Sequence, residues 1–232
     1  RYMNVTAVSL ALLSGILPAL LWLWFWLRED NLHPEPRSRI SKTFLAGMLS
    51  VLIVLPIQIL IADYTNKGSS EQYLLWAFAE EFLKFSAAFI VALSTDIIDE
   101  PIDAIIYMIT AALGFSALEN ALFVLKPILD GNIVSTIVTT NLRFIGASLL
   151  HIVSSASIGL CIALAFYENS RIKHMAVFTG LILATALHTL FNLFIIEASA
   201  FGTLTIFSVV WLAVVVLMLL FEKVKTIKPH YV

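Results

Sequence analysis

The sequence predicts an all-α, polytopic membrane helix bundle of about seven transmembrane helices, with the N-terminus outside and the C-terminus in the cytoplasm. The chain of 232 residues is 60% hydrophobic and only 13% charged, which is far from the composition of a soluble domain. Its mean hydropathy of +0.94 agrees with this. Apolar runs of about 18 or more residues recur with short polar stretches between them. We therefore expect one membrane-embedded domain over residues 1–232.

Each expected helix corresponds to one apolar run. The first run is too long for a signal peptide and lacks a small-residue cleavage site before Arg28, so we interpret it as a span. Trp22, Trp24 and Trp26 crowd its far end, as in an interfacial aromatic belt. The expected spans cover residues 5–27, 43–62, 73–94, 102–125, 142–166, 175–196 and 204–221.

An acidic cluster precedes the fourth span. Asp99 can cap the helix, and Pro101 suits its first turn. Glu100 and Asp103 suit the positive N-terminal end of the helix dipole. We therefore interpret the cluster as helix-start chemistry and not as a metal site.

The orientation follows from the basic residues, which gather in alternate loops. Those of the first loop, the fifth loop and the tail are Arg28, Arg37, Arg39, Lys42, Arg171, Lys173, Lys223, Lys225 and Lys228. The opposite side carries only Arg1, Lys67 and Lys126, with Arg143 near a helix end. By the positive-inside rule, the side with more basic residues faces the cytoplasm.

A charged motif, Glu80-Glu81-Phe82-Leu83-Lys84, lies in the middle of the apolar run of residues 73–93. A charge at the centre of a membrane helix costs about 2.5–3.5 kcal/mol on insertion scales. Each apolar neighbour favours insertion of the helix by only about 0.3–0.6 kcal/mol. Such residues need partners on other helices and mark a functional site by default. The later runs supply candidate partners, which are Glu119, His151, His188 and Asn192.

These polar residues are expected to lie at a similar depth in the membrane. Counted from the expected outer helix ends, the acids and imidazoles fall roughly 9–14 Å below the outer surface. Unrelated polar residues would scatter over the full ~30 Å of the hydrocarbon core. The members of this layer are Glu80, Glu81, Glu119, His151 and His188.

Helical spacing predicts which of these residues share a face. Glu80 and Lys84 are four residues apart and can pair, whereas Glu81 points about 100° away from Glu80. One carboxylate is then salt-bridged while its neighbour faces a cavity. His188 and Asn192 also share a face.

Each residue also has a purely structural interpretation. Glu80 can form an intramembrane salt bridge, and Glu119 can hydrogen-bond to another helix as a protonated acid. His151 can be a packing residue, and His188 with Asn192 can join two helices by hydrogen bonds. Taken together, however, three acids and two imidazoles on four helices are what general acid–base chemistry requires. Taken as a set, these residues therefore favour a catalytic site over purely structural contacts.

The motifs resemble those of the PrsW family of intramembrane proteases. The matching residues are Glu-Glu-x-x-Lys at 80–84, Phe-x-x-x-Glu at 115–119, His151 and His-x-x-x-Asn at 188–192, with further similarity at 33–36 and 100–120. The wider superfamily includes the CAAX prenyl endopeptidases, whose pattern is Glu-Glu-x-x-x-Arg and Phe-x-x-x-His. Here Lys84 comes one position earlier than that arginine, and Glu119 replaces that histidine. These departures favour PrsW over prenyl processing.

The resemblance implies a protease-like domain that hydrolyses a peptide bond inside a bacterial or archaeal cell membrane. Its partners are expected to be the lipid bilayer and a single-pass membrane-protein substrate, such as an anti-sigma factor. No nucleic-acid partner is expected.

The resemblance also implies roles for the charged motif. Glu80, which matches the first glutamate of the related endopeptidases, is predicted to be the base that activates water. Pairing with Lys84 is predicted to keep Glu80 ionised, as a base must be. Glu81 can exchange roles with Glu80, and the sequence does not separate the two.

The remaining residues are predicted to assist the same hydrolysis. Glu119 and His151 would position the water or carry its proton. His188 and Asn192, one helical turn apart, would donate hydrogen bonds to the tetrahedral oxyanion. This glutamic-type hydrolysis needs no cofactor.

A second enzymatic prediction is a zinc protease. Here Glu119, His151 and His188 are zinc ligands, with Glu80 or Glu81 as the base. Because these ligands come from three helices and no His-Glu-x-x-His helix is present, the metal-free version is preferred.

Two non-enzymatic alternatives are a proton-coupled transporter and a scaffold that binds partner helices. A transporter predicts polar residues along a path across the bilayer, and not in one layer. A cleavage assay separates the scaffold from an enzyme.

Overall fold

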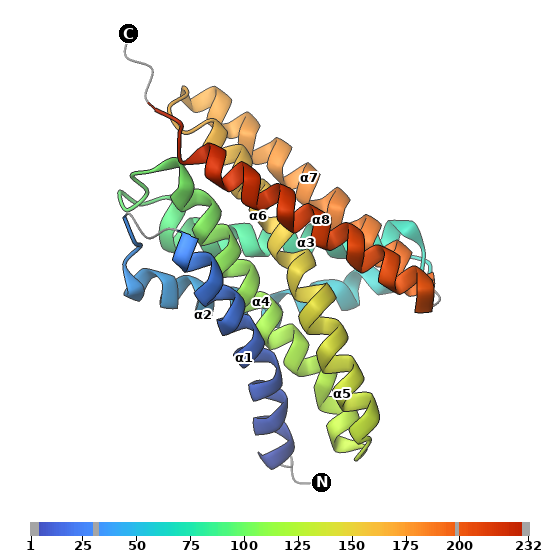
Figure 1. Cartoon of the computed structure of the whole chain (residues 1–232). Helices are drawn as coiled ribbons and strands as arrows, with labels where there is room; N and C mark the ends of the chain where they lie inside the picture. Colours follow the sequence, from blue (N-terminus) through green and yellow to red (C-terminus); the bar gives the residue numbers. More distant parts are fainter. Residues whose placement is uncertain (1–4, 30–32, 198–199, 229–232) are drawn as a thin grey trace.

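The computed structural model describes residues 5–29, 33–197 and 200–228, and these residues form helices and loops without a strand (Figure 1). Arg1 and residues 30–32 of the first loop, which entered the predictions above, lie outside the described residues. The elements are α1 (Val5–Glu29), α2 (Arg37–Tyr64), α3 (Ser70–Ala88), η1 (Phe89–Leu93), α4 (Pro101–Leu129), α5 (Ile133–Leu142), η2 (Arg143–Ala147), α6 (Ser148–Leu164), α7 (Ser170–Glu197) and α8 (Ala200–Val224). The predicted all-α fold is confirmed.

Six helical segments in the described chain are long and apolar enough to cross a membrane. They are Val5–Glu29, Arg37–Tyr64, Pro101–Leu129, Ile133–Leu164, Ser170–Ile195 and Gly202–Val224. The remaining predicted span corresponds to α3, which carries Glu71, Glu80, Glu81 and Lys84 and so falls short by composition. The molecule is therefore a multi-pass membrane protein whose least apolar helix carries the charged motif.

The predicted helix boundaries are wrong at two places. The fifth span begins at Ile133 and not at residue 142, because Asn132 caps it by accepting a hydrogen bond from the Ser135 backbone N–H. Its polar side chains are satisfied within the helix, as where Thr140 donates to the carbonyl of Thr136. The cap of α4 is Glu100 and not Asp99.

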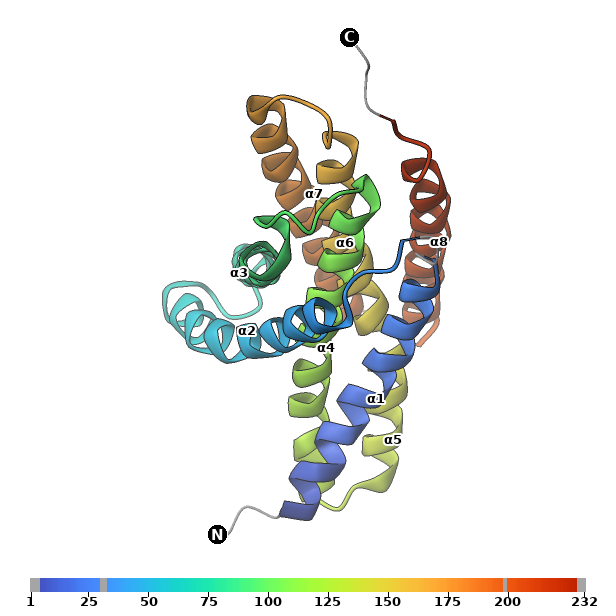
Figure 2. The same cartoon turned by 90° about the vertical axis from the view of Figure 1, so that its left-hand side faces the viewer.

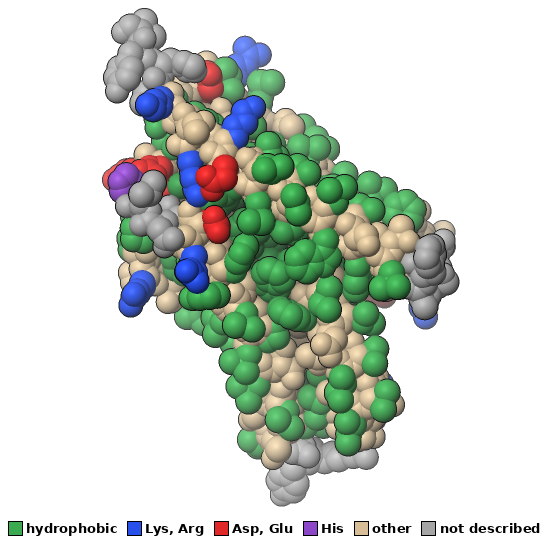
Figure 3. All heavy atoms as spheres, viewed as in Figure 1, with side chains coloured by type: hydrophobic (Ala, Val, Ile, Leu, Met, Phe, Trp, Pro, Cys, Tyr) green, Lys and Arg blue, Asp and Glu red, His purple; other side chains and the backbone are tan. Residues whose placement is uncertain are grey.

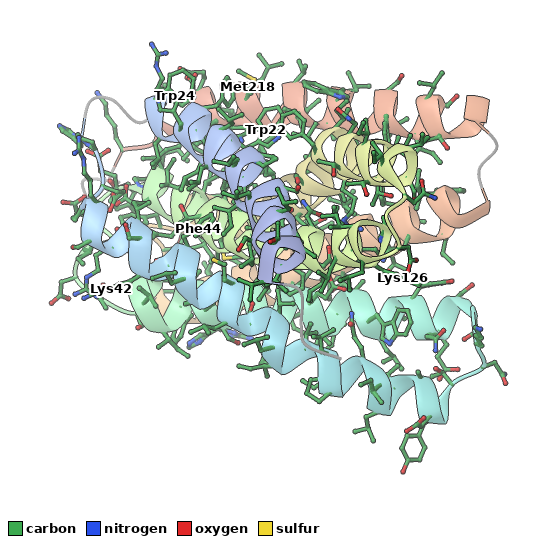
Figure 4. All side chains as sticks on the ribbon, turned by 90° about the horizontal axis from the view of Figure 1, so that it is seen from below. Trp22, Trp24, Lys42, Phe44, Lys126 and Met218 are labelled. Carbon is green, nitrogen blue, oxygen red and sulfur yellow. The ribbon has the colours of Figure 1, made fainter. Side chains whose placement is uncertain are left out.

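The first helix buries one stripe of small and apolar side chains against α4, and this stripe continues to Trp26. Trp26 is buried against Phe221 of α8, with ring centroids 5.8 Å apart, whereas Trp24 is 59% exposed. Trp22, labelled with Trp24 in Figure 4, is partly buried and contacts Trp211 of α8. Trp26 thus lies on the buried face of α1, and the interfacial depth of the three tryptophans stays a prediction.

Helix α4 is the centre of the molecule, and it is buried along most of its length. Glycines allow α1 and α2 to approach its backbone closely. A Cβ on Gly15 would lie 2.1 Å from the carbonyl oxygen of Ala117, and a Cβ on Gly47 would lie 2.1 Å from that of Ala111. In Figure 2, α2 runs across the molecule while α1 and α4 run along it. Beyond the close crossing, α2 and α4 therefore diverge.

On the face drawn in Figure 3, hydrophobic side chains are widely exposed, and most of the charged side chains gather toward the end where α8 ends. Large hydrophobic side chains are exposed on every helix from α1 to α8. The start of α1 and the end of α8 lie at opposite ends of the molecule (Figure 1). Which compartment each end faces remains a prediction from the positive-inside rule.

Candidate functional site

A pocket of about 650 Å³ lies where α2, α3, α4, α6, α7 and α8 meet. We call it the chamber. Five of the predicted site residues line it, which are Glu80, Glu119, His151, His188 and Asn192. Aromatic side chains, among them Trp76, Phe115 and Phe207, make up much of the remaining wall. Small residues beside the motif, such as Ala77 and Ala88, let the helices approach each other.

Glu81 and Lys84 lie behind the chamber wall as a fully buried ion pair. The Lys84 Nζ is 2.6 Å from the Glu81 Oε1. The predicted pairing of Lys84 with Glu80 is therefore wrong. Glu81 also accepts hydrogen bonds from the Ser155 hydroxyl at 2.7 Å and from the His188 Nδ1 at 2.7 Å. Such a saturated carboxylate stabilises the helix contacts around it and has little capacity left for a reaction.

Glu80 differs from Glu81 because it points about 100° around the helix, toward the chamber. Its Oε1 accepts a hydrogen bond from the Gln58 Nε2 of α2 at 2.8 Å. Its Oε2 is buried and has no hydrogen-bond partner among the described residues. The His188 Nε2 lies 3.6 Å from that oxygen.

The hydrogen bonds of the two histidines define which nitrogen carries a proton. The Lys84 ammonium has only donors and lies 2.9 Å from the His151 Nδ1, which must accept. The His151 Nε2 then donates to the Glu119 Oε2 at 3.1 Å. In His188 the Nδ1 donates to the Glu81 carboxylate, so the Nε2 of the neutral ring is an acceptor. With Glu80 ionised and His188 neutral, the Glu80 Oε2 and the His188 Nε2 face each other as two acceptors, 3.6 Å apart.

Glu119 of α4 also lines the chamber. Its Oε2 is bonded to the Arg143 Nη2 as well as to His151. The side chains of Glu119 and Arg143 are 18% and 17% exposed, so both reach the open space. The structure thus joins the acids and imidazoles of four helices into one network, while their catalytic roles stay predictions. The predicted depth count is wrong for His151, because its helix begins at Ile133 and not at residue 142.

Sequence reasoning missed two residues of this site. Gln58 is a lone amide in the second apolar run, and the need to pair it inside the membrane was the available signal. Arg143 was placed near a helix end and used only as a marker of orientation. Because the helix begins at Ile133, the whole of α5 (Ile133–Leu142) precedes Arg143. Arg143 therefore lies well inside the helical segment, where it lines the chamber.

Three residues of the chamber could together hold a metal ion. Among the described residues, ligand atoms of Glu80, His151 and His188 lie within 4.8 Å of one another. The buried, unpartnered Glu80 Oε2 and the His188 Nε2, whose ring is held by Glu81, suit a cation of the zinc type. This set contains Glu80 in place of the predicted Glu119, which is held by Arg143. His151 joins it only by giving up one of its two present hydrogen bonds.

Residues 35–220 match the family model described as PrsW family intramembrane metalloprotease. The chain belongs to the PrsW family. The predicted resemblance is confirmed, and the family description includes a metal-dependent mechanism.

Several proteins named Protease PrsW are similar to this chain in sequence. The protein of Geobacillus kaustophilus is 32% identical over 114 residues, which cover 48% of this chain and 51% of that protein. The protein of Shouchella clausii is 26% identical over 220 residues, covering 94% of this chain and 96% of that protein. The protein of Bacillus subtilis is 29% identical over 114 residues, covering 48% and 52%. No solved structure matches the chain.

These matches fix the cellular setting of this PrsW-family protein. The relatives are bacterial, and the described part of the chain contains six helices that can span a membrane. It is an integral multi-pass protein of a bacterial membrane. The alignments cover about half of the Geobacillus and Bacillus proteins and nearly all of the Shouchella protein.

Proposed function

We propose that this PrsW-family protein is an intramembrane protease that hydrolyses a peptide bond of a membrane-protein substrate in the chamber. The observation that carries the proposal is the Glu80 Oε2, which is buried, unpartnered among the described residues and 3.6 Å from the His188 Nε2. Two facing acceptors in a pocket of about 650 Å³ suit a water molecule that donates to both. A water held in this way is a nucleophile beside its base.

Glu80 is the proposed general base. Its carboxylate takes a proton from the water as the water attacks the substrate carbonyl, and it then returns that proton to the leaving amine. Gln58 fixes the other carboxylate oxygen, so that the Oε2 faces the chamber. Glu81 does not compete for this role, because its oxygens are occupied by Lys84, Ser155 and His188.

Asn192 is the proposed hydrogen-bond donor to the developing oxyanion, and the role of His188 depends on its protonation. The Asn192 amide lines the chamber one helical turn from His188 and can donate a hydrogen bond. His188 can donate from its Nε2 only when both ring nitrogens carry protons. In the neutral ring bonded to Glu81, that nitrogen instead accepts from the water or binds a cation.

Metal-dependent and metal-free hydrolysis are both compatible with these residues, and each has an observation in its favour. A divalent cation such as zinc, held by Glu80, His151 and His188, would make a bound water more acidic and polarise the substrate carbonyl. The two facing acceptors favour this version. The metal-free, glutamic-type version is favoured by His151, both of whose nitrogens are already hydrogen-bonded to Lys84 and Glu119.

The proposed substrate is a single-pass membrane protein, such as an anti-sigma factor, that enters from the bilayer. A helical substrate hides its peptide bonds in internal hydrogen bonds and must unwind locally before cleavage. The aromatic and aliphatic wall of the chamber offers such an unwound segment an apolar surface, beside the polar groups that line the same pocket.

The proposal is tested by co-expressing the protein with a single-span reporter and measuring the shortened product. Glu80→Gln and His188→Ala should each lower cleavage by about 10²–10⁴-fold, because base and water position are lost. Lys126→Gln is the control, since Lys126 is 83% exposed and pairs with Asp130 outside the chamber. Membrane insertion of every variant is checked by fractionation. Equal shortening by Glu80→Gln and wild type would refute the assignment, and binding of the reporter without shortening would favour a scaffold.

Metal dependence is decided on the purified protein. Elemental analysis of wild type and His188→Ala, with activity measured after chelation and after adding zinc back, separates the two versions. One bound metal per wild-type chain, lost in His188→Ala, supports the metalloprotease. Full activity in chelated, metal-free protein supports glutamic-type hydrolysis.

A further inference from the structure

Arg143 contacts one continuous face of α4 at the rim of the chamber. Its Nη2 donates to the Glu119 Oε2, and its Nε donates to the Asn120 Oδ1 at 2.5 Å. Its guanidinium carbon also lies 3.8 Å from the centroid of the Phe123 ring. The side chain is thus held by three groups of a single helix, which leaves it little freedom to turn elsewhere.

The position of Arg143 is set by its local backbone and by a buried polar group. Arg143 begins η2, a π-helical turn inside the segment Ile133–Leu164, and such turns are frequent at functional sites. The Asn120 Nδ2 donates to the hydroxyls of Ser116 at 3.1 Å and Ser148 at 3.0 Å. Because these bonds fix the amide, its Oδ1 is presented to Arg143.

The charges of the chamber divide into two neutral pairs and one remaining acid. Lys84 balances Glu81 behind the wall, and Arg143 balances Glu119 at the rim. Among the described residues that line the chamber, this leaves Glu80 as the carboxylate without a lysine or arginine partner. A negative charge in this apolar setting seeks a proton, a proton donor or a cation.

We infer that Arg143 is a positioning residue, which holds the Glu119 carboxylate on His151 and neutralises it, so that Glu80 is the single uncompensated acid at the reacting centre. The inference rests on the proposed function. Without Arg143, Glu119 would be a second unbalanced acid next to His151, free to turn toward the chamber. The reacting centre would then have two competing carboxylates.

Direct binding of the substrate by Arg143 is the competing explanation, and kinetics separate the two. A positioning residue affects the chemical step, so its loss lowers kcat and leaves KM near the wild-type value. A residue that binds substrate equally in the ground and transition states raises KM instead. A residue with a purely structural role lowers the amount of folded protein and leaves both constants of the folded fraction unchanged.

The test is a double-mutant cycle on purified protein, with Arg143→Gln, Glu119→Gln, the double variant, Arg143→Lys and the Lys126→Gln control. Arg143→Gln should lower kcat by about 10–100-fold with little change in KM. The double variant should be no slower than Glu119→Gln alone, because removing both charges leaves nothing to balance. Arg143→Lys should recover part of the loss, since it restores the charge but not the two-pronged contact. Additive losses, or a loss confined to KM, would overturn the inference.

The melting temperature of the same variants gives a readout that does not depend on cleavage. Arg143→Gln should lower it more than the double variant does, because only the single variant leaves Glu119 unbalanced in the membrane interior. If wild type does not cleave the reporter, the proposed function fails, while this coupling still decides whether Arg143 and Glu119 act as one unit. Equal melting temperatures across the cycle would refute the pairing itself.

Discussion

The two ends of the buried part of α4 both gather acidic side chains, but they leave them in different states. At its N-terminal end, Asp103 accepts hydrogen bonds from the backbone N–H groups of Asp99 at 3.0 Å and Glu100 at 2.8 Å. The Tyr107 hydroxyl donates to Glu35 at 2.5 Å, and His33 pairs with Glu100. The acidic side chains of this cluster therefore bind the start of α4 and connect it to the first loop.

The chamber, built around the other half of α4, leaves one acid unsatisfied. Glu81 and Glu119 are paired with Lys84 and Arg143, whereas the Glu80 Oε2 lacks a hydrogen-bond partner within the described part of the chain. A buried polar atom without a partner is costly and persists where function requires it. The comparison teaches that the unsatisfied atom beside a pocket, and not the density of acids, distinguishes a candidate site.

Breaking the ion pair behind the chamber should have the largest effect on stability. Lys84→Met leaves Glu81 as a buried charge without its cation, which costs about 3–5 kcal/mol. Asp103→Ala at the other end removes the hydrogen bonds to the backbone N–H groups of Asp99 and Glu100, at about 0.5–2 kcal/mol. Thermal unfolding in detergent measures both. Adding Glu81→Gln to Lys84→Met should recover much of the loss, and an equal cost at the two ends would contradict the contrast between them.

Removing the hydrogen bond that orients Glu80 should affect catalysis more than stability. Gln58→Leu removes the hydrogen bond to the Glu80 Oε1. Because Glu80 can then turn away from the chamber, kcat on the reporter should fall about 10-fold while the melting temperature changes little. Gln58→Glu is a harsher variant, since it places a second acid beside Glu80. An unchanged kcat in Gln58→Leu would mean that packing alone orients Glu80.

The smallest effect is expected at the N-terminal end of α4. Tyr107→Phe removes one hydrogen bond to Glu35, which is worth about 0.5–1.5 kcal/mol. Cleavage per folded molecule should stay at the wild-type level, because this cluster satisfies its own acids. Steady-state kinetics normalised to folded protein provide the measurement. A tenfold or larger loss of kcat would link this end of α4 to catalysis and would contradict the contrast between the acidic cluster and the chamber.

The sequence by itself determined the helical fold and the polar residues that meet between the helices. Apolar runs define spans because backbone polar groups in lipid must be satisfied within the helix. The cost of charge inside a membrane was enough to predict that Glu80, Glu119, His151 and His188 come together, and all four line the chamber. The family resemblance was also available from the spacing of these motifs, and the comparisons confirmed it.

Only the tertiary structure decided which side chains pair. Glu80 and Glu81 are equally able to reach Lys84 by helical spacing, and the choice depends on how α3 is rotated against α2 and α6. Arg143 entered the site because its helix begins at Ile133, a boundary set by the Asn132 cap. Residue counting gives the spacing of residues along one helix. Pairing depends on helix rotation and on contacts between segments far apart in the chain, which residue counting does not contain.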